Sequence, residues 1–242
     1  MMSESNPDRE APSPREVYDE LYRRTGFGDA PRFYRWVTRR IAARPEDRIL
    51  DIGCGAGGAL VELERAHSSA IGLDFSAVAL RAARIRTRLP LVQGDGTRLP
   101  FPDQSFDHVL NLGNLEHFAE LGAGVREMRR VLKPDGRAWV LLPNLFYSGA
   151  IWRAVRFGTG PDHHQPIDRF ATRAEWRAVL EAGGLGVIRS EPYHKGKWWK
   201  RMLPSNLAWH FLYETRPAQP VGRALPPLER RRPLLDGARL AD

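Results

Sequence analysis

A short apolar segment that runs directly into a glycine-rich bend constrains this chain more than any other feature. Residues 48–52 (Arg-Ile-Leu-Asp-Ile) lead into Gly53, and further glycines follow at 55, 57 and 58 before residues 59–64 resume with helical spacing. This pattern is typical of a buried parallel strand that turns at once into a helix. Glycine suits such a bend because the backbone must adopt φ angles forbidden to other residues and approach a ligand closely. We therefore predict a ligand-binding loop at residues 53–58.

The carboxylates around this loop indicate the charge of the ligand. The glycines of residues 53–58 match the G-x-G-x-x-G pattern of dinucleotide sites, which is a weak signal when it stands alone. Asp51 precedes the loop by two residues, where it would repel a pyrophosphate and attract a sulfonium or ammonium cation. Asp74 ends the next apolar run, about 20 residues after the first glycine. A carboxylate there is required to bind ribose hydroxyls, whether the ligand is a dinucleotide or a cation with a ribose. Asp95 follows a third apolar run and could accept a hydrogen bond from an adenine amino group. Only the hypothesis of a cationic ligand predicts a carboxylate at this position.

Further short motifs follow the loop in a fixed order. They are LDIGCGAG (50–57), GLDFS (72–76), GD (94–95) with LPF (99–101), FD (106–107), LEH (115–117) and RVLKPDG (130–136). In this order and spacing they resemble the motifs of class I S-adenosylmethionine-dependent methyltransferases, and more narrowly the branch related to quinone-biosynthesis methyltransferases. The resemblance is strong over residues 46–144 and loose over 172–215. It implies an enzyme that uses S-adenosylmethionine as its cofactor.

The composition limits the class of protein. Of the 242 residues, 42% are hydrophobic, which is enough for one sizeable core, and the motif spacing argues for a single domain. No run of 18 apolar residues occurs, and residues 1–20 lack an apolar signal-peptide core, so we expect a cytoplasmic protein. The single cysteine, Cys54, excludes an internal disulfide and a cysteine-based zinc site, and we interpret it as a filler of the loop.

The net charge of +8 is unevenly distributed. Residues 193–242 carry ten basic side chains against four acidic ones, so the motif-bearing half is nearly neutral. The chain has 33 arginines and four lysines, which indicates a compositional bias rather than a surface built for nucleic acid. No arginine-rich helix with interleaved aromatic residues crosses the core. These features argue against a nucleic-acid partner.

The alternation of apolar runs and helical patterns predicts the fold class. We predict an α/β, doubly wound, Rossmann-like sheet of seven strands, mostly parallel with an antiparallel final strand, and helices on both faces. After the first strand at 48–52, the expected strands are 70–74, 89–93, 106–112, 137–142, 185–192 and 207–215. The expected helices are 57–66, 77–87 with Ser76 as N-cap, 122–132, 146–157 and 173–182 with Thr172 as N-cap.

The same reading divides the chain into segments. Residues 1–14 are polar and proline-rich, and residues 216–242 are rich in proline and arginine, so we expect both to be disordered. Residues 15–215 would form one methyltransferase domain. Within it, two amphipathic helices in 15–45 would precede the first strand, and the irregular segment 145–171 would form a lid over the acceptor site. We interpret the tyrosines of the N-terminal helices as packing residues rather than ligand contacts.

The resemblance implies a set of cofactor-binding residues. The glycine loop and Asp51 would hold the methionine end, Asp74 the ribose hydroxyls, and Asp95 with Gly96 the adenine. Position 96 is more often alanine in the family, and glycine leaves only its backbone available there. The full set is Asp51, Gly53, Cys54, Gly55, Gly57, Asp74, Phe75, Asp95, Gly96, Asn111 and Leu112.

The methyl acceptor and any catalytic base are less constrained. Transfer from a sulfonium needs alignment and exclusion of water more than a dedicated catalytic residue. For a hydroxyl or protonated amine a general base helps, and histidine suits neutral pH. The candidates are His117 of the LEH motif, His163 and His164 in the expected lid, and His194. No third ligand at metal spacing accompanies the adjacent histidines, so we predict no metal. We predict transfer to an oxygen or nitrogen of a small-molecule acceptor.

Two alternatives remain open from the sequence. The stretch 195–201 (Lys-Gly-Lys-Trp-Trp-Lys-Arg) combines cations with two tryptophans and could contact anionic lipid, which would suit a lipid-linked glycan as acceptor at the membrane surface. The ordinary interpretation of this stretch is a solvated loop. A second alternative is a partner subunit that binds S-adenosylmethionine without catalysis. A nicotinamide-dependent reductase on a similar sheet is a rival that would need a Tyr-x-x-x-Lys pair at its site, and we expect no such pair there.

Overall fold

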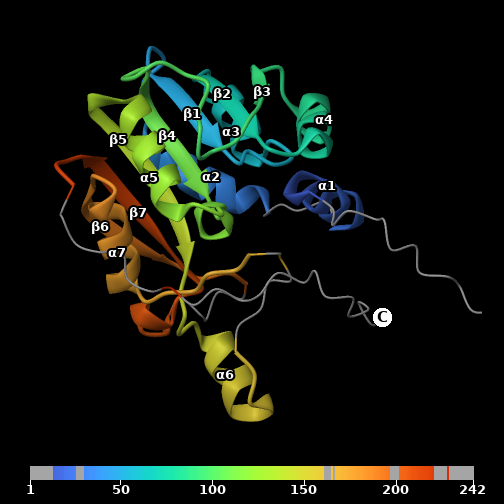
Figure 1. Ribbon diagram of the computed structural model, residues 1–242, viewed down its shortest axis with the longest axis vertical. Coiled ribbons are helices and arrows are strands. Elements are labelled where there is room, and N and C mark those ends of the chain that lie inside the picture. The colour runs from blue at the N-terminus through green and yellow to red at the C-terminus, as the bar shows by residue number, and fades with distance from the viewer. Residues whose placement is uncertain are drawn as a thin grey trace, which may run out of the picture.

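The computed structural model describes residues 13–25, 30–160, 165, 167–196, 202–220 and 228. Seven strands form one sheet in the order β3-β2-β1-β4-β5-β7-β6 (Figure 1). Strands β1 to β5 are parallel to one another, whereas β7 runs antiparallel to both β5 and β6. The predicted fold class is confirmed. The strands are β1 Arg48–Ile52, β2 Ser69–Asp74, β3 Leu91–Gln93, β4 Phe106–Leu112, β5 Leu132–Pro143, β6 Leu185–Tyr193 and β7 His210–Pro217.

Local signals in the sequence set where the helices begin. The Ser76 hydroxyl accepts a hydrogen bond from the Ala79 amide at 3.1 Å, which caps α4, and Thr172 forms a capping box with Glu175 at the start of α7. The helices are α1 Pro14–Thr25, α2 Pro31–Ile41, α3 Gly58–Arg65, α4 Ala77–Arg86, α5 Leu121–Val131, α6 Ser148–Phe157 and α7 Arg173–Ala182, with short 3-10 turns η1 Leu115–His117 and η3 Ser205–Leu207.

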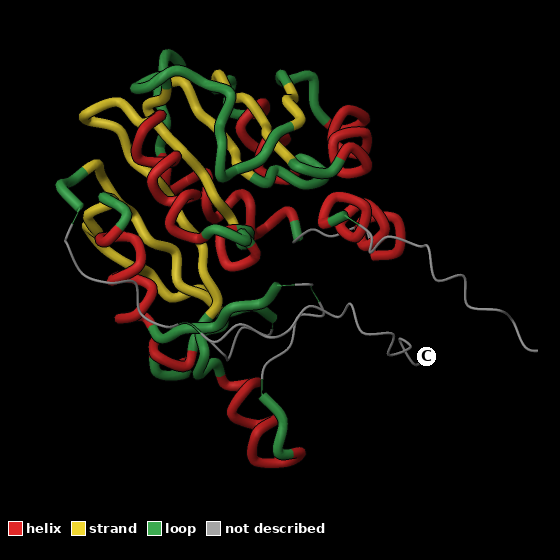
Figure 2. Tube along the Cα trace, in the orientation of Figure 1, coloured by secondary structure: helices red, strands yellow, loops and turns green. Residues whose placement is uncertain are grey.

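Two apolar layers sandwich the sheet, because successive side chains of a strand point to opposite faces. Val109, Ala138 and Val140 face one side, where α5 and α7 supply residues such as Met128 and Trp176. The other face carries Leu110, Trp139 and Leu141 under α2 and α3, which supply Val37 and Leu60 among others. Figure 2 shows these helices on both sides of the sheet. The core therefore fixes the strands, and their carboxyl ends remain available for a site.

Strand β5 begins earlier than the sequence predicts. The helix-terminating Pro134 and Gly136 predict a start at residue 137, but the chain pairs with β4 from Leu132, which lies opposite Phe106. An irregularity in the β4 pairing between Phe106 and His108 accommodates the additional residues. The Lys133 ammonium then contacts the Asp107 carboxylate at 2.8 Å and secures this end of the sheet.

Helix α6 stands apart from the two layers and extends away from the sheet in Figure 1. Its base is held by a small apolar cluster of Tyr147, Ala150 and Phe170, with Trp209 packed against it. The predicted helix 146–157 is present and begins at Ser148. No helix in the described ranges is long and apolar enough to cross a membrane. The expected disordered segments, 1–14 and 216–242, lie mostly outside the described residues, as do residues 197–201 of the basic stretch. At their described edges the expectation is wrong, because Pro14 begins α1 and β7 continues to Pro217.

Candidate functional site

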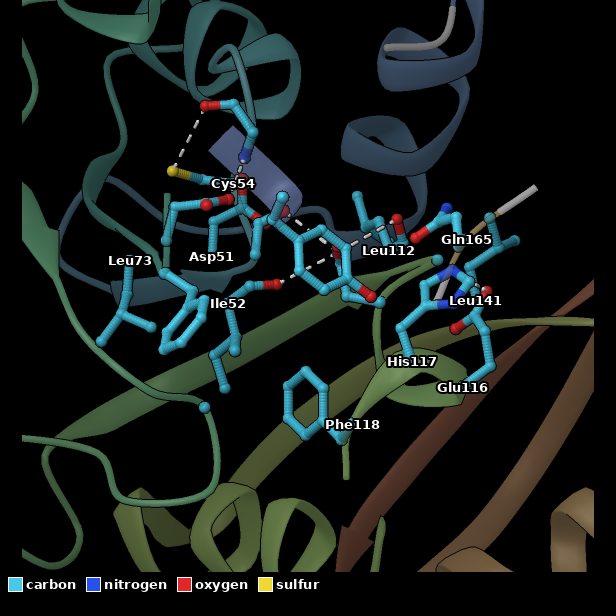
Figure 3. A pocket seen from close by; sticks show the side chains of 18 of the residues that line it. Asp51, Ile52, Cys54, Leu73, Leu112, Glu116, His117, Phe118, Leu141 and Gln165 are labelled. Carbon is cyan, nitrogen blue, oxygen red and sulfur yellow. Dashed lines mark hydrogen bonds and ion pairs between the residues drawn. The ribbon is translucent and has the colours of Figure 1, made fainter. Parts of the chain in front are cut away.

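A cavity of about 790 Å³ opens at the carboxyl ends of the parallel strands (Figure 3). Its floor comes from the ends of β1, β2 and β4 and from the segment after β3, and its far wall from β5 and the start of β7. The helices α1 and α2 close the opposite side through Tyr18, Tyr22 and Tyr34. This is the position in which open α/β sheets bind ligands, and the volume suits a cofactor together with a small acceptor.

The predicted glycine loop crosses the cavity floor in a conformation that requires glycine. Gly53 and Gly55 have φ angles of 68° and 53°. A Cβ atom at Gly55 would lie 2.9 Å from the Tyr22 hydroxyl oxygen, and one at Gly53 would overlap the side chain of Asn114. Gly57, with φ of 75°, is the N-cap of α3 and lies outside the cavity lining. The loop therefore exposes bare backbone to a ligand at 53 and 55.

Asp74, at the end of β2, is hydrogen-bonded to the glycine loop that follows β1. Its side chain is buried, and its two oxygens accept hydrogen bonds of 2.8 Å from the amides of Gly55 and Ser76. Burial raises the pKa of Asp74 to about 6, although these two amide bonds oppose the shift. The carboxylate is thus fixed in orientation beside the glycine loop.

Asp51 lies deeper in the cavity, one strand away. It is buried, and desolvation together with the nearby Asp74 carboxylate raises its pKa to about 8. Two carboxylates in a common low-dielectric site favour a cationic ligand, because a positive charge would offset the cost of ionising both. The geometry agrees with the charge preference predicted from the sequence.

Asp95 and Gly96 line the cavity beyond β3. One oxygen of Asp95 accepts hydrogen bonds of 2.8 Å from the amide and the hydroxyl of Thr97, and the side chain is exposed. A Cβ atom at Gly96 would overlap the ring of Phe118, which also lines the cavity. The glycine at 96 therefore makes room for an aromatic wall, a relation between two distant residues that the sequence did not indicate.

Most of the predicted cofactor residues meet at this cavity. Asn111 does not line it: the side chain is buried, and its carbonyl oxygen accepts a hydrogen bond of 2.9 Å from the Leu115 amide, which positions η1. Burial raises the pKa of the Cys54 thiol, which argues against a nucleophilic role. The predicted residues that line the cavity are Asp51, Gly53, Cys54, Gly55, Asp74, Phe75, Asp95, Gly96 and Leu112.

Two acidic side chains flank His117 at the other end of the cavity. The Nδ1 atom of His117 lies 2.6 Å from the carbonyl oxygen of Ile167 and 3.3 Å from an Asp168 oxygen. A carbonyl oxygen can only accept, so Nδ1 carries a hydrogen, and in the neutral form of the ring Nε2 carries the lone pair. Nε2 lies 3.7 Å from Glu116 Oε1, and Figure 3 shows both side chains together at the cavity.

Glu116 is a site residue that the sequence did not single out. Its side chain is 2% exposed, and burial raises its pKa to about 8. Within the described part of the chain, its Oε2 atom has no hydrogen-bond partner, as is also true of the Tyr18 hydroxyl. Both residues line the cavity. A buried polar atom without a partner is rare in folded proteins and is common where a ligand supplies the missing bond.

The remaining histidine candidates are placed differently. His163 and His164 lie outside the described residues, so their roles stay predictions. His194 is described and does not line the cavity, although its neighbour Lys195 does. From the expected lid, Gln165 and Ile167 reach the cavity and α6 contributes no residue.

Aromatic side chains contribute more to the cavity than the sequence indicates. Tyr18, Tyr22 and Tyr34 line the cavity, whereas Phe33 packs in the core with 1% exposure. Amphipathic spacing predicts the buried face of a helix but does not distinguish a core from a ligand site. Trp209, after η3, also lines the cavity and was not predicted.

The reductase alternative fails on geometry. The one Tyr-x-x-x-Lys spacing in the sequence joins Tyr193 to Lys197. The ring centroid of Tyr193 lies 4.9 Å from that of Phe33 and 5.1 Å from that of Trp36, and Tyr193 is not part of the cavity lining. The tyrosine is therefore a packing residue of β6 and not a proton donor at the site.

Comparisons with known proteins agree with this geometry. A family model described as a methyltransferase domain matches residues 50–140. The demethylmenaquinone methyltransferase of Mycolicibacterium vanbaalenii is 40% identical over 176 residues, which cover 65% of this chain and 77% of the relative. The chain belongs to the class I S-adenosylmethionine-dependent methyltransferases. Within this family it falls in the quinone-biosynthesis-related branch, as its motifs predicted.

Other relatives match over a shorter region. The demethylmenaquinone methyltransferase of Corynebacterium kroppenstedtii is 39% identical over 114 residues, 47% of this chain and 49% of the relative. The chain thus spans about half the length of several curated relatives. A chain of the Haloferax volcanii complex between the Trm112 methyltransferase activator and a methyltransferase has the same fold, with a TM-score of 0.63, 21% identity and coverage of 86% of this chain and 98% of that one.

Proposed function

We propose that this chain transfers the methyl group of S-adenosylmethionine to a small aromatic acceptor with an ionisable hydroxyl, of the hydroquinone class. One observation carries the proposal. A single cavity joins a glycine cradle with two buried carboxylates at one end to Glu116 and His117 at the other. The name demethylmenaquinone methyltransferase, borne by the relatives, supports a quinone-type acceptor.

The cofactor end fits S-adenosylmethionine. The bare backbone at Gly53 and Gly55 would accommodate the methionine part, Asp74 would accept the ribose hydroxyls, and Asp51 would face the positive charge. When bound, S-adenosylmethionine supplies a methyl group already activated by its sulfonium. The chain therefore needs to align the acceptor, exclude water and remove a proton. Tyr22 of α1 covers the glycine loop at Gly55, Tyr18 lines the same cavity, and both would limit access of water.

The acceptor end offers a proton acceptor and a proton donor side by side. The Nδ1 hydrogen of His117 is engaged by Ile167, so the Nε2 lone pair is the one that can take the proton of an acceptor hydroxyl. Glu116, with a pKa of about 8, stays protonated at neutral pH and could donate to the acceptor oxygen. The separation of 3.7 Å between Nε2 and Glu116 Oε1 is too long for a direct hydrogen bond and leaves an oxygen from the acceptor room to contact both.

Removal of the hydroxyl proton makes the ring electron-rich. Its electrons can then attack through the oxygen or through an adjacent ring carbon, so the base is useful for either product. Trp209 and Phe118 line the cavity and provide aromatic surface for a planar ring. The arrangement thus favours an aromatic hydroxyl over a saturated alcohol or a simple amine.

A methyl-transfer assay tests the proposal. The purified chain, free of partners, is incubated with methyl-labelled S-adenosylmethionine and a chemically reduced naphthoquinone that lacks the ring methyl group. We expect a labelled product by mass spectrometry, formed by the parent and lost in Glu116→Gln and Asp74→Ala variants that remain folded. Cofactor binding without any product would indicate a non-catalytic subunit. Comparison of metabolites from strains with and without the gene would identify a different acceptor.

A further inference from the structure

Helix α6 presents an apolar surface to solvent. Phe146 before the helix is 53% exposed, and within it Trp152 is 61%, Val155 84%, Phe157 56% and Ile151 39% exposed. Large apolar side chains that are exposed singly are ordinary, but a contiguous group of them marks an interaction site. This group lies within twelve consecutive residues.

Three of the exposed residues share one side of the helix. Ile151 and Val155 are four residues apart and Trp152 lies beside them, so the three form a stripe along α6. The ring of Trp152 meets that of Phe157 edge to face at a centroid distance of 5.3 Å, which widens the stripe. Among the residues that the structure describes, packing involves the base of the helix, since Ala150 is buried and joins the cluster around Tyr147.

The charge on α6 indicates the nature of its partner. Its sequence, SGAIWRAVRF, contains Arg153 and Arg156 and no acidic residue. The Arg156 guanidinium lies 5.3 Å from the centroid of the Phe157 ring, at the edge of the apolar stripe. Arg156 is exposed, whereas Arg153 is partly buried. A short helix with an apolar stripe, an interfacial tryptophan and an exposed arginine at its edge is suited to lie in the headgroup region of an anionic bilayer.

We propose that α6 docks this chain on the surface of an anionic membrane. Ile151, Trp152 and Val155 would enter the boundary of the acyl chains, and Arg156 would remain among the phosphate headgroups. No part of this proposal depends on the identity of the methyl acceptor.

The base of α6 lies next to the acceptor end of the cavity. Tyr147, at the base of the helix, packs on Trp209 at a centroid distance of 4.4 Å, and Trp209 lines the acceptor end of the cavity. Lys195 lines the same end, with its ammonium 6.0 Å from the centroid of the Trp209 ring. A docked helix would therefore bring this end of the cavity near the membrane. Delivery of an apolar acceptor by that route rests on the proposed function, whereas docking does not.

Vesicle sedimentation tests the docking surface directly. The full chain is mixed with vesicles of phosphatidylcholine and phosphatidylglycerol at 7:3, and the bound fraction is measured at increasing lipid concentration. We expect the double variant Trp152→Ser, Val155→Ser to weaken partitioning by about tenfold or more, because two inserted side chains are lost. Ile85→Ser is the matched control, since Ile85 of α4 is 87% exposed on another part of the surface and its removal should change nothing.

A charge variant tests the headgroup contact. Arg156→Glu should weaken binding to the phosphatidylglycerol vesicles several-fold and have little effect with phosphatidylcholine alone. Arg84→Glu on α4 controls for the change in net charge.

Three outcomes would overturn the proposal. The parent chain fails to sediment with vesicles, or the double variant sediments like the parent, or the double variant converts a dimer into a monomer in light scattering without any vesicle binding by the parent. The last result would assign the stripe to a second copy of the chain. Methyl transfer to a water-soluble acceptor should be equal in the parent and the double variant, so a failure of docking is distinguishable from a failure of the proposed function.

Discussion

The Asp74 carboxylate accepts a hydrogen bond of 2.8 Å from the Gly55 amide, and this contact joins the end of β2 to the loop after β1. The residue expected to bind ribose is thus also a structural support of the glycine loop. A change at either position should disturb cofactor binding, and the two effects can be separated by the choice of substitution.

Gly55→Ala should weaken binding of S-adenosylmethionine at least tens-fold and Gly55→Val should abolish it, because the φ angle of 53° disfavours a side chain and the new Cβ atom would lie 2.9 Å from the Tyr22 hydroxyl oxygen at the cavity wall. Gly158→Ala is the matched control. Gly158 also has a positive φ, 66°, but no atom of the described structure lies within 4 Å of the position that a Cβ atom would take there. Calorimetric titration should show parent affinity for Gly158→Ala. Equal losses of affinity in Gly55→Ala and Gly158→Ala would assign the loss to backbone strain alone.

The affinity for S-adenosylmethionine should depend on pH through Asp51. The pKa of Asp51 is about 8 in the free chain, so binding of a cation requires loss of a proton below that pH. We expect the dissociation constant to rise by up to about tenfold per pH unit as the pH falls from 8 towards 6.5. Adenosine carries no cation and should bind equally across this window, and Asp51→Asn should remove the dependence. A flat profile for the parent would show that Asp51 does not face the charge.

The same burial should make the ligand-free chain less stable as the pH rises. Asp51 and Glu116 both have folded pKa values of about 8, above the values of 3.8 and 4.5 expected for the unfolded chain. Between these limits the folded state binds more protons, so the contribution of these two groups to stability is full below about pH 4 and is lost as the pH rises through 8. The contribution is roughly 1 kcal/mol per pH unit and group. Thermal unfolding between pH 5 and 8 should show a smaller loss in Asp51→Asn and Glu116→Gln than in the parent.

The base can be located by comparing two sets of histidine variants. His117→Gln should remove the acidic limb of the pH–rate profile, because Nε2 of His117 is placed to take the acceptor proton. The double variant His163→Ala, His164→Ala should bind S-adenosylmethionine nearly normally and lose most methyl transfer if these residues position the acceptor, with a lower rate at every pH. Loss of the acidic limb in the double variant and its retention in His117→Gln would move the base into the segment 163–164.

The sequence predicted those parts of the fold that depend on local signals. The capping residues Ser76 and Thr172 begin helices where expected, and β4 has the predicted bounds. The predicted carboxylates Asp51, Asp74 and Asp95 meet because parallel strands present their carboxyl ends at one edge of the sheet. A strand, the turn after it and the helix cap each depend on a few neighbouring residues, so each can be predicted from a short stretch of sequence.

The remaining features depend on contacts between distant segments. Asp168 approaches His117 from 51 residues further along the chain, and Phe118 fills the space that glycine leaves at position 96. Tyr22 of α1 covers Gly55, although a tyrosine on an amphipathic helix predicts a packing role equally well. Such pairs follow from the packing of α1, η1 and the segment after α6 against the sheet, which periodicity does not specify.

Calorimetric titration of the purified chain and its Asp74→Ala variant with S-adenosylmethionine tests the central claim most directly. A carboxylate that accepts the ribose hydroxyl bonds contributes roughly 2–3 kcal/mol, and its removal also frees the Gly55 and Ser76 amides. We predict one binding site in the parent and an affinity lower by tens-fold or more in a variant that remains folded by circular dichroism. Asp135→Ala, which removes an exposed carboxylate at the opposite end of the sheet, should bind like the parent. Equal affinity in the parent and in folded Asp74→Ala would contradict the assignment of this cavity to the cofactor.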